Sequence, residues 1–478
     1  MVRQVNPLRT PGWKAALAVA VAVGALLWHL LACTESPMAF SPGGDLAFVT
    51  MEPYAGGESR RESLILAGPR AYRLMILSKD GKLRVLEETT RHMLLAPGWS
   101  RDGKRLCYLR IPLLSGKALE QMRATARKRK ELYGRATSRP AVEWPLEQGQ
   151  PRPAEAPTTQ ADDDEGPDGM PPLENVVEFL ERVYTGPLVP LTLVVRDANT
   201  GKVLSTDEVE LPLLGMEDEE EEEVDFMLAY TRIRPQWGPK GEWVYLCGGQ
   251  AAVAVRPNAG SFRVITASAE NAVLSPDGRT LATIQEGAVG FFSTDGASAV
   301  YRRWQMTDDF PSMAWIDNRT LALLEHVKEG EKLLHRLHRI RRDGSAAKST
   351  LLRLPKHAYD DDRNPGQLAI APDGKHMAIA YEKDVFFMKA SGQVLRHWRS
   401  ENEIRAQPTF TPDSRHVAMK CFTKEDEDEV GYLRVAWIVY YTPDGKEVRR
   451  VKIPPIRPGT TRSASRPATA PAAEEASD

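Results

Sequence analysis

Histidine and carboxylate groupings are the residues of this sequence whose types and spacing could support chemistry. His335 and His338 form a His-x-x-His pair, and Asp360–Asp362 is a run of three carboxylates. On a helix the two histidines would share a face and could hold a metal ion. The surrounding Leu333–Ile340 precedes an Asp-Gly turn and is predicted to be a strand, which sends the two rings to opposite faces. Asp360–Asp362 could form a cation-binding loop, but we interpret it as a solvated connection.

Other candidate chemistry is sparse. His376 and His416 occupy matching positions beside two repeated turns, which favours a structural origin. The sequence holds no Gly-x-Ser-x-Gly nucleophile elbow, no P-loop and no dinucleotide-binding glycine pattern. We therefore predict no catalytic, cofactor-binding or metal-binding residue and expect no cofactor.

Composition further narrows the class of protein that this sequence can belong to. The chain has 478 residues, 42% of them hydrophobic, and a formal net charge of −2, so no global field favours nucleic acid. Its four cysteines are too few for a disulfide framework in a chain of this length, and no Cys-x-x-Cys pair exists. Three of them, Cys107, Cys247 and Cys421, fall in apolar runs and are predicted to be buried free thiols.

The N-terminus carries the pattern of an export or anchoring segment. Residues 1–14 contain only basic charges, and residues 15–31 are nearly all apolar. This order places the flank in the cytoplasm and exports the rest of the chain. The segment ends in Leu30-Leu-Ala-Cys33, which resembles the lipobox of bacterial lipoproteins and makes Cys33 a candidate for lipidation. A lipoprotein signal, an uncleaved signal anchor and a cleaved signal all remain open. The first two tether the body to a membrane, facing the periplasm or cell exterior.

The elements that would position any site come from a repeated phrase. It consists of an apolar residue, a polar one, Pro-Asp-Gly or a variant, one or two polar residues and an apolar run. The copies are Ala39–Phe48, Gly98–Tyr108, Gln236–Tyr245, Val273–Ala282, Met313–Ala322, Ala369–Ala378 and Thr409–Ala418. Such a phrase predicts a tight hairpin, in which Asp bonds its own backbone and Gly or Asn supplies a positive φ.

A second hairpin comes after the first in each repeat. Examples are Arg73–Leu86, Leu191–Leu204, Val385–Leu395 and Ala436–Val448. Two hairpins give four strands, and the last four phrases lie 40, 56 and 40 residues apart, counted from Asp277, Asp317, Asp373 and Asp413. A four-stranded unit at this spacing is typical of a β-propeller blade.

These phrases resemble the WD40-like (PD40) repeats of TolB-type propellers over roughly residues 38–455. The aromatic residue that this family places before serine is kept at Phe40 and Trp99, and Trp237 is comparable. It is absent at Leu274 and Ile370, while Trp315 and Phe410 lie at roughly the same place. The resemblance implies an all-β propeller of about seven blades, from 38 to 456, with a binding or scaffolding role at the bacterial cell envelope.

Three segments depart from the strand pattern. Residues 112–186 interrupt blade 2 and contain two predicted short helices, a basic one at Lys117–Tyr133 and an apolar-striped one at Leu173–Tyr184. Residues 215–226 hold the acidic run Glu217–Glu223, which we interpret as a solvating loop. Residues 457–478 have the composition of a disordered tail. We expect the first two segments to project from one rim.

Three functional interpretations remain open. The first is a module that binds a protein, a peptide or a glycan, as a monomer. The second is a propeller enzyme, lactonase- or lyase-like, with its site at the central channel. In the third, the basic helix and the acidic loop dock the partner and the propeller is a platform. Because the first blade starts at Met38, no N-terminal strand is left to complete blade 7. We expect side-chain packing to close the ring, and a count of six or eight blades stays an alternative.

Overall fold

The computed structural model describes the chain in segments that together carry twenty-eight strands. They are 37–53, 70–112, 188–212, 233–248, 251–259, 261–266, 271–285, 288–295, 299–303, 312–329, 332–343, 347–352, 354, 366–381, 383–400, 402–427 and 433–455.

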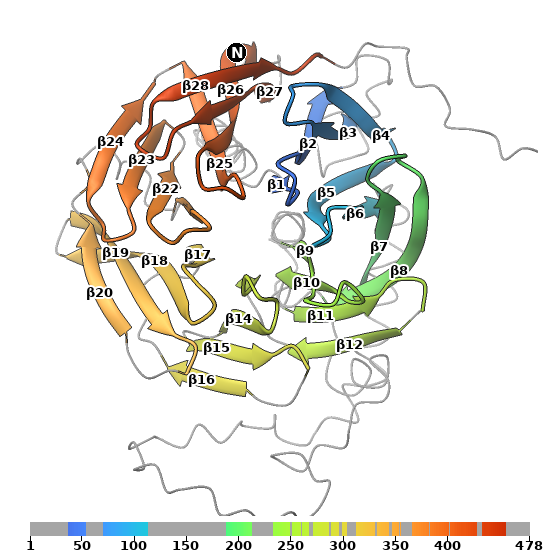
Figure 1. The fold of residues 1–478 in the computed structure, drawn as a ribbon, viewed down its shortest axis with the longest axis horizontal. Coiled ribbons are helices and arrows are strands. Elements are labelled where there is room, and N and C mark those ends of the chain that lie inside the picture. Colours follow the sequence, from blue (N-terminus) through green and yellow to red (C-terminus); the bar gives the residue numbers. More distant parts are fainter. Residues whose placement is uncertain are drawn as a thin grey trace, which may run out of the picture.

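Seven four-stranded antiparallel sheets form a ring (Figure 1). Blade 1 consists of β1 (Ala39–Phe40), β2 (Leu46–Pro53), β3 (Arg70–Leu77) and β4 (Leu83–Thr89). Blade 2 consists of β5 (His92–Trp99), β6 (Arg105–Pro112), β7 (Leu188–Asp197) and β8 (Val203–Pro212). Blade 3 consists of β9 (Arg234–Trp237), β10 (Val244–Gly248), β11 (Ala251–Arg256) and β12 (Ser261–Thr266). Blade 4 consists of β13 (Asn271–Leu274), β14 (Thr280–Gln285), β15 (Ala288–Ser293) and β16 (Ala299–Arg303).

The remaining blades repeat the plan. Blade 5 consists of β17 (Ser312–Trp315), β18 (Thr320–Glu329), β19 (Lys332–Arg341) and β20 (Ala347–Leu352). Blade 6 consists of β21 (Gln367–Ile370), β22 (His376–Ala380), β23 (Asp384–Lys389) and β24 (Val394–Arg399). Blade 7 consists of β25 (Glu403–Phe410), β26 (Val417–Glu427), β27 (Leu433–Tyr441) and β28 (Glu447–Lys452). The predicted seven-bladed propeller is confirmed, and the six- and eight-blade alternatives are wrong.

Every blade runs from an inner first strand to an outer fourth strand (Figure 1). Because neighbouring strands are antiparallel, the turn after the first strand and the turn after the third lie at the same end of each blade. We call this end the turn face. The connections after the second and fourth strands lie at the opposite end, which we call the insertion face. Residues 54–69, 113–187 and 213–232 all leave the described strands at the insertion face.

The repeated phrase forms the first turn of each blade, and blade 4 illustrates its chemistry. The Ser275 amide closes the turn on the Thr280 carbonyl at 2.8 Å. One carboxylate oxygen of Asp277 accepts the Ser275 hydroxyl at 2.6 Å and the Arg279 amide at 3.1 Å. Gly278 has a φ of 69°, which glycine adopts with less strain than residues that carry a Cβ. The predicted Asp-to-backbone bond is therefore confirmed.

Two blades depart from this glycine rule in a way that the sequence prediction missed. Asn318 was expected to supply a positive φ in blade 5, but it is absent from the described residues with positive φ. The blade 5 turn closes in fewer residues, from the Ile316 amide to the Thr320 carbonyl, and the Asn318 side chain instead accepts the Asp277 amide of blade 4 at 2.8 Å. In blade 7, Ser414 takes the positive φ, 61°, and its hydroxyl accepts the Asp373 amide of blade 6 at 2.9 Å.

The turn aspartates make stability depend on acid. Hydrogen bonds from Ser100, Thr411 and Thr442 hold the pKa values of the Asp102, Asp413 and Asp444 carboxyls below their ordinary value of 3.8. A lowered folded-state pKa contributes stability that is present above the unfolded value and is lost as the pH falls through the folded value. We expect the free energy of unfolding in urea to fall below about pH 4. A triple Asp→Asn variant should show a flatter acid limb, and parallel profiles would contradict the role of these carboxyls.

Tryptophans of the repeated phrase join neighbouring blades. The indole N–H of Trp99 donates to the Ala39 carbonyl at 3.0 Å, and that of Trp315 donates to the Val273 carbonyl at 3.1 Å. Trp237, which is 6% exposed, donates to the Gly98 carbonyl of blade 2 at 3.1 Å. In each case the acceptor lies on the inner strand of the preceding blade, so the phrase encodes a contact between blades as well as a turn.

Replacing Trp237 with phenylalanine should therefore lower the free energy of unfolding by about 0.5–1.5 kcal/mol, because the Gly98 carbonyl loses the indole donor and keeps the weaker Cys107 S–H donor at 3.2 Å. Trp243→Phe is the matched control, since the Trp243 indole N–H has no hydrogen-bond partner among the described residues. Denaturant unfolding of both variants measures the difference. Equal losses would show that ring volume, and not the hydrogen bond, matters.

The core lies between the blades. One apolar cluster spans blades 1, 2 and 3, and further clusters join blades 3 and 4, 4 and 5, 5 and 6, 6 and 7, and finally 7 and 1. Each blade buries both faces, which explains why the second and third strands are nearly continuous apolar runs. Burial of these side chains is the main favourable term holding the ring together.

Ring closure uses no shared strand, as the early start of blade 1 predicted. β1 to β4 form blade 1 and β25 to β28 form blade 7. Buried apolar residues from both blades meet at this seam; they are Met38, Leu46, Phe48, Met75, Leu77, Ala406, Ala418, Phe422, Val435, Ile438, Tyr440 and Ile453. The fully buried Lys420 of blade 7 donates to the Val49 carbonyl of blade 1 at 2.9 Å. Arg73 of blade 1 donates to the Pro454 carbonyl at 3.2 Å.

Candidate functional site

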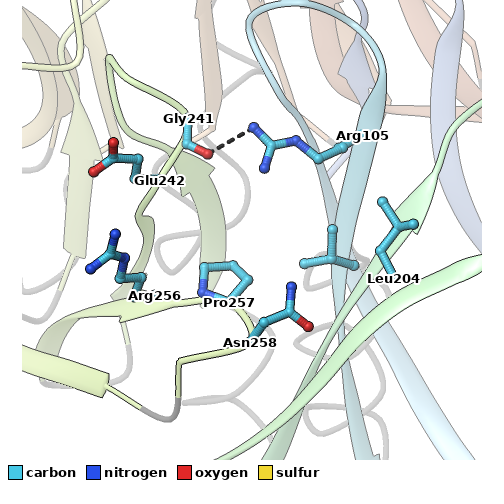
Figure 2. Close-up of a pocket in the computed structure, with 8 residues that line it drawn as sticks. Arg105, Leu204, Gly241, Glu242, Arg256, Pro257 and Asn258 are labelled. Carbon is cyan, nitrogen blue, oxygen red and sulfur yellow. Dashed lines mark hydrogen bonds between the residues drawn. The ribbon is translucent and has the colours of Figure 1, made fainter.

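A groove of about 410 Å³ lies between blades 2 and 3 at the turn face (Figure 2). Its lining comes from the starts of β6 and β8, the end of β7 and the two turns of blade 3. The described lining residues are Arg105, Val195, Leu204, Gly241, Glu242, Arg256, Pro257 and Asn258. The groove therefore exists only where two blades meet.

Arg105 is the fixed cation of the groove. Its guanidinium lies 4.4 Å from the centre of the Trp237 ring, and Nη2 donates to the Gly241 carbonyl at 2.7 Å (Figure 2). A planar guanidinium stacked on an aromatic face loses little further freedom when it binds a carboxylate. Arg105 is thus preorganised, with its stem on blade 2 and its anchors on blade 3.

Arg256 and Glu242 are the charged side chains of the groove that make no polar contact with another described residue. Both are exposed, and neither forms an ion pair or a hydrogen bond through its side chain with another described residue. Figure 2 shows them on the blade 3 side of the groove, across from Leu204. Arg256 can therefore pair with an incoming anion without first breaking a bond within the protein.

The apolar part of the groove is held open by a bridge between the blades. Asn258 has a φ of 66°, a conformation that asparagine tolerates better than most residues. The backbone amide of Asn258 donates to the Asp207 carboxylate of β8 at 3.1 Å, which ties the blade 3 turn to the outer strand of blade 2. Leu204, on the same strand, stays 42% exposed.

This set of side chains suits recognition of an anion. The described lining holds two guanidinium groups, one carboxylate and three apolar side chains, and no histidine, cysteine or serine. Guanidinium groups recognise carboxylates through paired charge-assisted hydrogen bonds. An extended peptide with an acidic residue beside an apolar one is complementary to this surface.

Three polar residues on the inner strands are hydrogen-bonded to the next blade. Gln236 accepts the Leu274 amide at 2.9 Å, and Ser312 accepts the Leu368 amide at 3.1 Å. Gln367 accepts the Gln407 amide in the same way. Each bond joins the inner strand of one blade to that of the next. These three side chains therefore satisfy backbone amides of the neighbouring blade.

The structure separates the two histidines of the His-x-x-His pair, as predicted. Both lie on β19. The His335 ring packs edge-on against Tyr381 of blade 6, with ring centres 5.0 Å apart. His338 is bonded instead to Glu325 and Ser349 within blade 5. His376 and His416 lie at equivalent turn positions, where their carbonyls accept the Ala371 and Thr411 amides.

The three cysteines of the strands are free and buried, which confirms the prediction. Burial raises the pKa of the Cys421 thiol to about 11 and raises those of Cys107 and Cys247 further. Such thiols are poor nucleophiles near neutral pH, so they act as small apolar side chains.

Several predicted features fall outside the described residues. They are Cys33, the segment 15–33, the two helices predicted in 112–186, the acidic loop 215–226, Asp360–Asp362 and the tail 457–478. Within the segments that the structure describes, no helix is long and apolar enough to cross a membrane. The same segments contain no group of three His, Cys, Asp or Glu side chains placed to hold a metal ion.

Sequence reasoning missed the groove residues. Arg105 follows the Asp-Gly turn of blade 2, and Pro257-Asn258 forms a turn in blade 3, yet nothing in either pattern indicates that the two come together. The usable clue is Trp237, because an aromatic residue at this position of the phrase contacts the preceding blade. Arg105 stacks on the ring that makes this contact.

The fold and the groove define a seven-bladed β-propeller with a charged cleft between two blades. No protein-family model matches the chain, and no curated protein sequence matches it.

Several solved structures resemble the chain in fold. The propeller domain of Cps50 (Swd1) from Myceliophteria thermophila is 10% identical, covers 88% of this chain and 97% of its own, and has a TM-score of 0.45. Hydrazine synthase from Kuenenia stuttgartiensis is 13% identical, with coverages of 81% and 92% and a TM-score of 0.45. The propeller domain of the Trilobed protease from Pyrococcus furiosus, described as having an open velcro topology, is 11% identical, with coverages of 88% and 97% and a TM-score of 0.42. These likenesses carry no argument about function.

Proposed function

We propose that this chain is a binding module that captures an extended peptide segment of a partner protein in the groove between blades 2 and 3. The observation that carries the proposal is the pair of arginines at this groove. Arg105 is immobilised between Trp237 and the Gly241 carbonyl, and Arg256 has no acidic partner among the described residues. An acidic side chain would lie between them, with an adjacent apolar side chain on Leu204 and Pro257.

We further propose that residues 15–33 tether the module to a membrane, facing the periplasm or cell exterior, because a basic flank precedes this apolar segment. Topology supports this arrangement. Residues 37 and 38 lead into β1 from the end opposite to its turn, so the N-terminal segment joins the propeller at the insertion face. The groove belongs to the turn face and would point away from the bilayer, where a partner can reach it.

The tether is tested by fractionation. The full chain should stay in the membrane pellet after a carbonate wash, whereas a chain starting at residue 34 should be soluble. Cys33→Ser separates the two modes of tethering, because a lipoprotein then loses incorporation of a clickable palmitate analogue and a signal anchor is unaffected. Release of the full chain by carbonate alone would contradict the tether.

The groove is tested by selecting binders from a random peptide display library on the full chain in detergent. We expect the selected sequences to share an acidic residue next to an apolar one. Arg256→Glu should abolish their recovery, and Arg319→Glu, which reverses an exposed turn-face arginine in blade 5, should not. Selected sequences without an acidic residue, or equal losses in both variants, would contradict the proposal.

The rival function is an enzyme with its site at the ring centre. The bonds made by Gln236, Ser312 and Gln367 commit polar inner-strand side chains to the backbone. No observation among the described residues favours the enzyme at that place, and we do not propose it.

A further inference from the structure

A chain of hydrogen bonds crosses blade 5 from its interior to its surface. His338 on β19 lies between two partners: its Nε2 is 2.8 Å from Oε1 of Glu325 on β18, and its Nδ1 is 2.7 Å from the Ser349 hydroxyl on β20. The three residues thus come from three adjacent strands of one sheet. A hydroxyl, an imidazole and a carboxylate in this order are the parts of an activated nucleophile.

Burial fixes the inner two members and leaves the outer one accessible. Glu325 and His338 are only 1% and 2% exposed, whereas Ser349 is exposed. A carboxylate at Glu325 accepts the proton on Nε2, which leaves the Nδ1 lone pair for the Ser349 hydroxyl. Because Glu325 and His338 are both shielded from water, their hydrogen bond holds the imidazole in one orientation toward Ser349.

The propeller fold does not require this arrangement. The register of the sheets gives the residue that matches His338 in each of the other six blades. Those residues are Met75, Val194, Val253, Gly290, Phe386 and Val439. None of them titrates, so an apolar residue or glycine satisfies the same place in the fold. Burying an imidazole and a carboxylate there costs desolvation free energy that the other blades avoid.

The surface around Ser349 offers a cation and an apolar contact. Alternation along β20 places Leu351, which is 43% exposed, on the same face as Ser349. On β19 the same rule places Arg336 beside His338. The Arg336 side chain is 35% exposed, and its Nη1 lies 3.9 Å from Oε1 of Glu325. An electrophile with an apolar group and a developing negative charge would find a partner for each.

From these contacts we propose that Ser349 is an activated hydroxyl that reacts with acyl or phosphonyl esters at the outer rim of blade 5. Ser349 Oγ forms a bond to the acyl carbon or to phosphorus, and its proton passes to His338 Nδ1. The bond to the leaving group breaks, and the leaving group departs with the electron pair and takes up that proton. Glu325 positions the imidazole throughout. The site lies in a different blade from the groove and does not depend on the groove's function.

The probe is a biotinylated fluorophosphonate, which exchanges its fluoride for the serine oxygen. The full chain is treated in detergent at neutral pH, digested, and searched by mass spectrometry for the modified serine. We expect adducts at Ser349 and none at Ser261, an exposed serine on the outer strand of blade 3 whose hydroxyl is bonded to the Ala259 carbonyl. Absence of an adduct at Ser349, or equal labelling of Ser261, would overturn the proposal without any variant.

Variants then separate activation from mere exposure. Ser349→Ala should abolish the adduct, and Ser261→Ala should leave it unchanged. His338→Gln should slow labelling of Ser349 by roughly 100-fold, the contribution typical of a positioned base. Thermal melting followed by circular dichroism checks that this variant is folded. An unchanged labelling rate in folded His338→Gln would show that the hydrogen-bond chain is only structural.

Discussion

Replacing Glu52 with alanine should lower the free energy of unfolding by about 2–3 kcal/mol, because the buried Arg73 guanidinium loses its hydrogen bond to Glu52 and keeps the carboxylate of Glu88, 3.8 Å from its Nε. Oε1 of Glu52 lies 3.1 Å from Arg73 Nη2, and the two side chains are 6% and 5% exposed. The same nitrogen of Arg73 donates to the Pro454 carbonyl just past the last strand of blade 7. The pair therefore fastens blade 1 to blade 7 at the seam.

Glu447→Ala provides the control. Glu447 pairs with Arg450 in blade 7 at 3.0 Å, and that pair is 38% and 30% exposed. Glu447 also lies 3.8 Å from the buried Arg405, which keeps Glu403 at 2.5 Å, so the loss of Glu447 should cost about 0–1 kcal/mol. Urea unfolding measures both variants. Hydrogen exchange adds a local readout, since protection of β28 should fall further than protection of blade 4 in Glu52→Ala. A loss below about 1 kcal/mol, or an even fall in protection, would contradict the role of the pair in closure.

The second large effect is expected at the groove. Arg256→Glu should weaken the affinity for a selected acidic peptide by at least about 30-fold, which corresponds to about 2 kcal/mol for removing one partner of a desolvated charge pair. Arg105→Ala should weaken it as well, with an added loss of packing on Trp237. Fluorescence anisotropy with the labelled peptide measures both, and Arg319→Glu should bind like the unchanged protein.

Loss of affinity for reasons of folding is distinguishable from loss of the charge. Arg256 is exposed and has no hydrogen bond through its side chain among the described residues, so its substitution should leave the melting temperature within the range of other surface changes. An affinity unchanged by Arg256→Glu would exclude the groove as the binding site.

The four-stranded plan of each blade could be predicted because residues close together in the sequence determine it. Each Pro-Asp-Gly phrase specifies a turn through the conformational preferences of three or four neighbouring residues, and repetition multiplies that information. Phe48, Met75 and Val439 then fall on buried strands as the apolar pattern requires. The start of blade 1 at Met38 likewise predicted closure without a shared strand, because all four strands of blade 1 then follow one another along the chain.

Features that depend on two blades were beyond the sequence. Arg105 and Arg256 are more than one hundred residues apart and meet only because blade 2 packs on blade 3. Asn318 and Ser414 were interpreted as turn residues only, whereas each side chain also accepts a hydrogen bond from a backbone amide of the preceding blade. Ala96 and Gln407 adopt positive φ values of 36° and 56° directly before Pro97 and Pro408, where the inner strands of blades 2 and 7 bulge. The prolines are the local mark of these bulges, which the sequence prediction missed.

The central claim is that the groove reads a carboxylate through Arg256, and a charge exchange tests it most directly. Isothermal titration calorimetry compares the protein and its Arg256→Glu variant, each with the selected peptide and with the same peptide carrying lysine in place of its acidic residue. We predict that each matched pair binds and each mismatched pair does not, so that the lysine peptide recovers binding to Arg256→Glu. A lysine peptide that binds neither protein, or an acidic peptide that binds both equally, would contradict the claim.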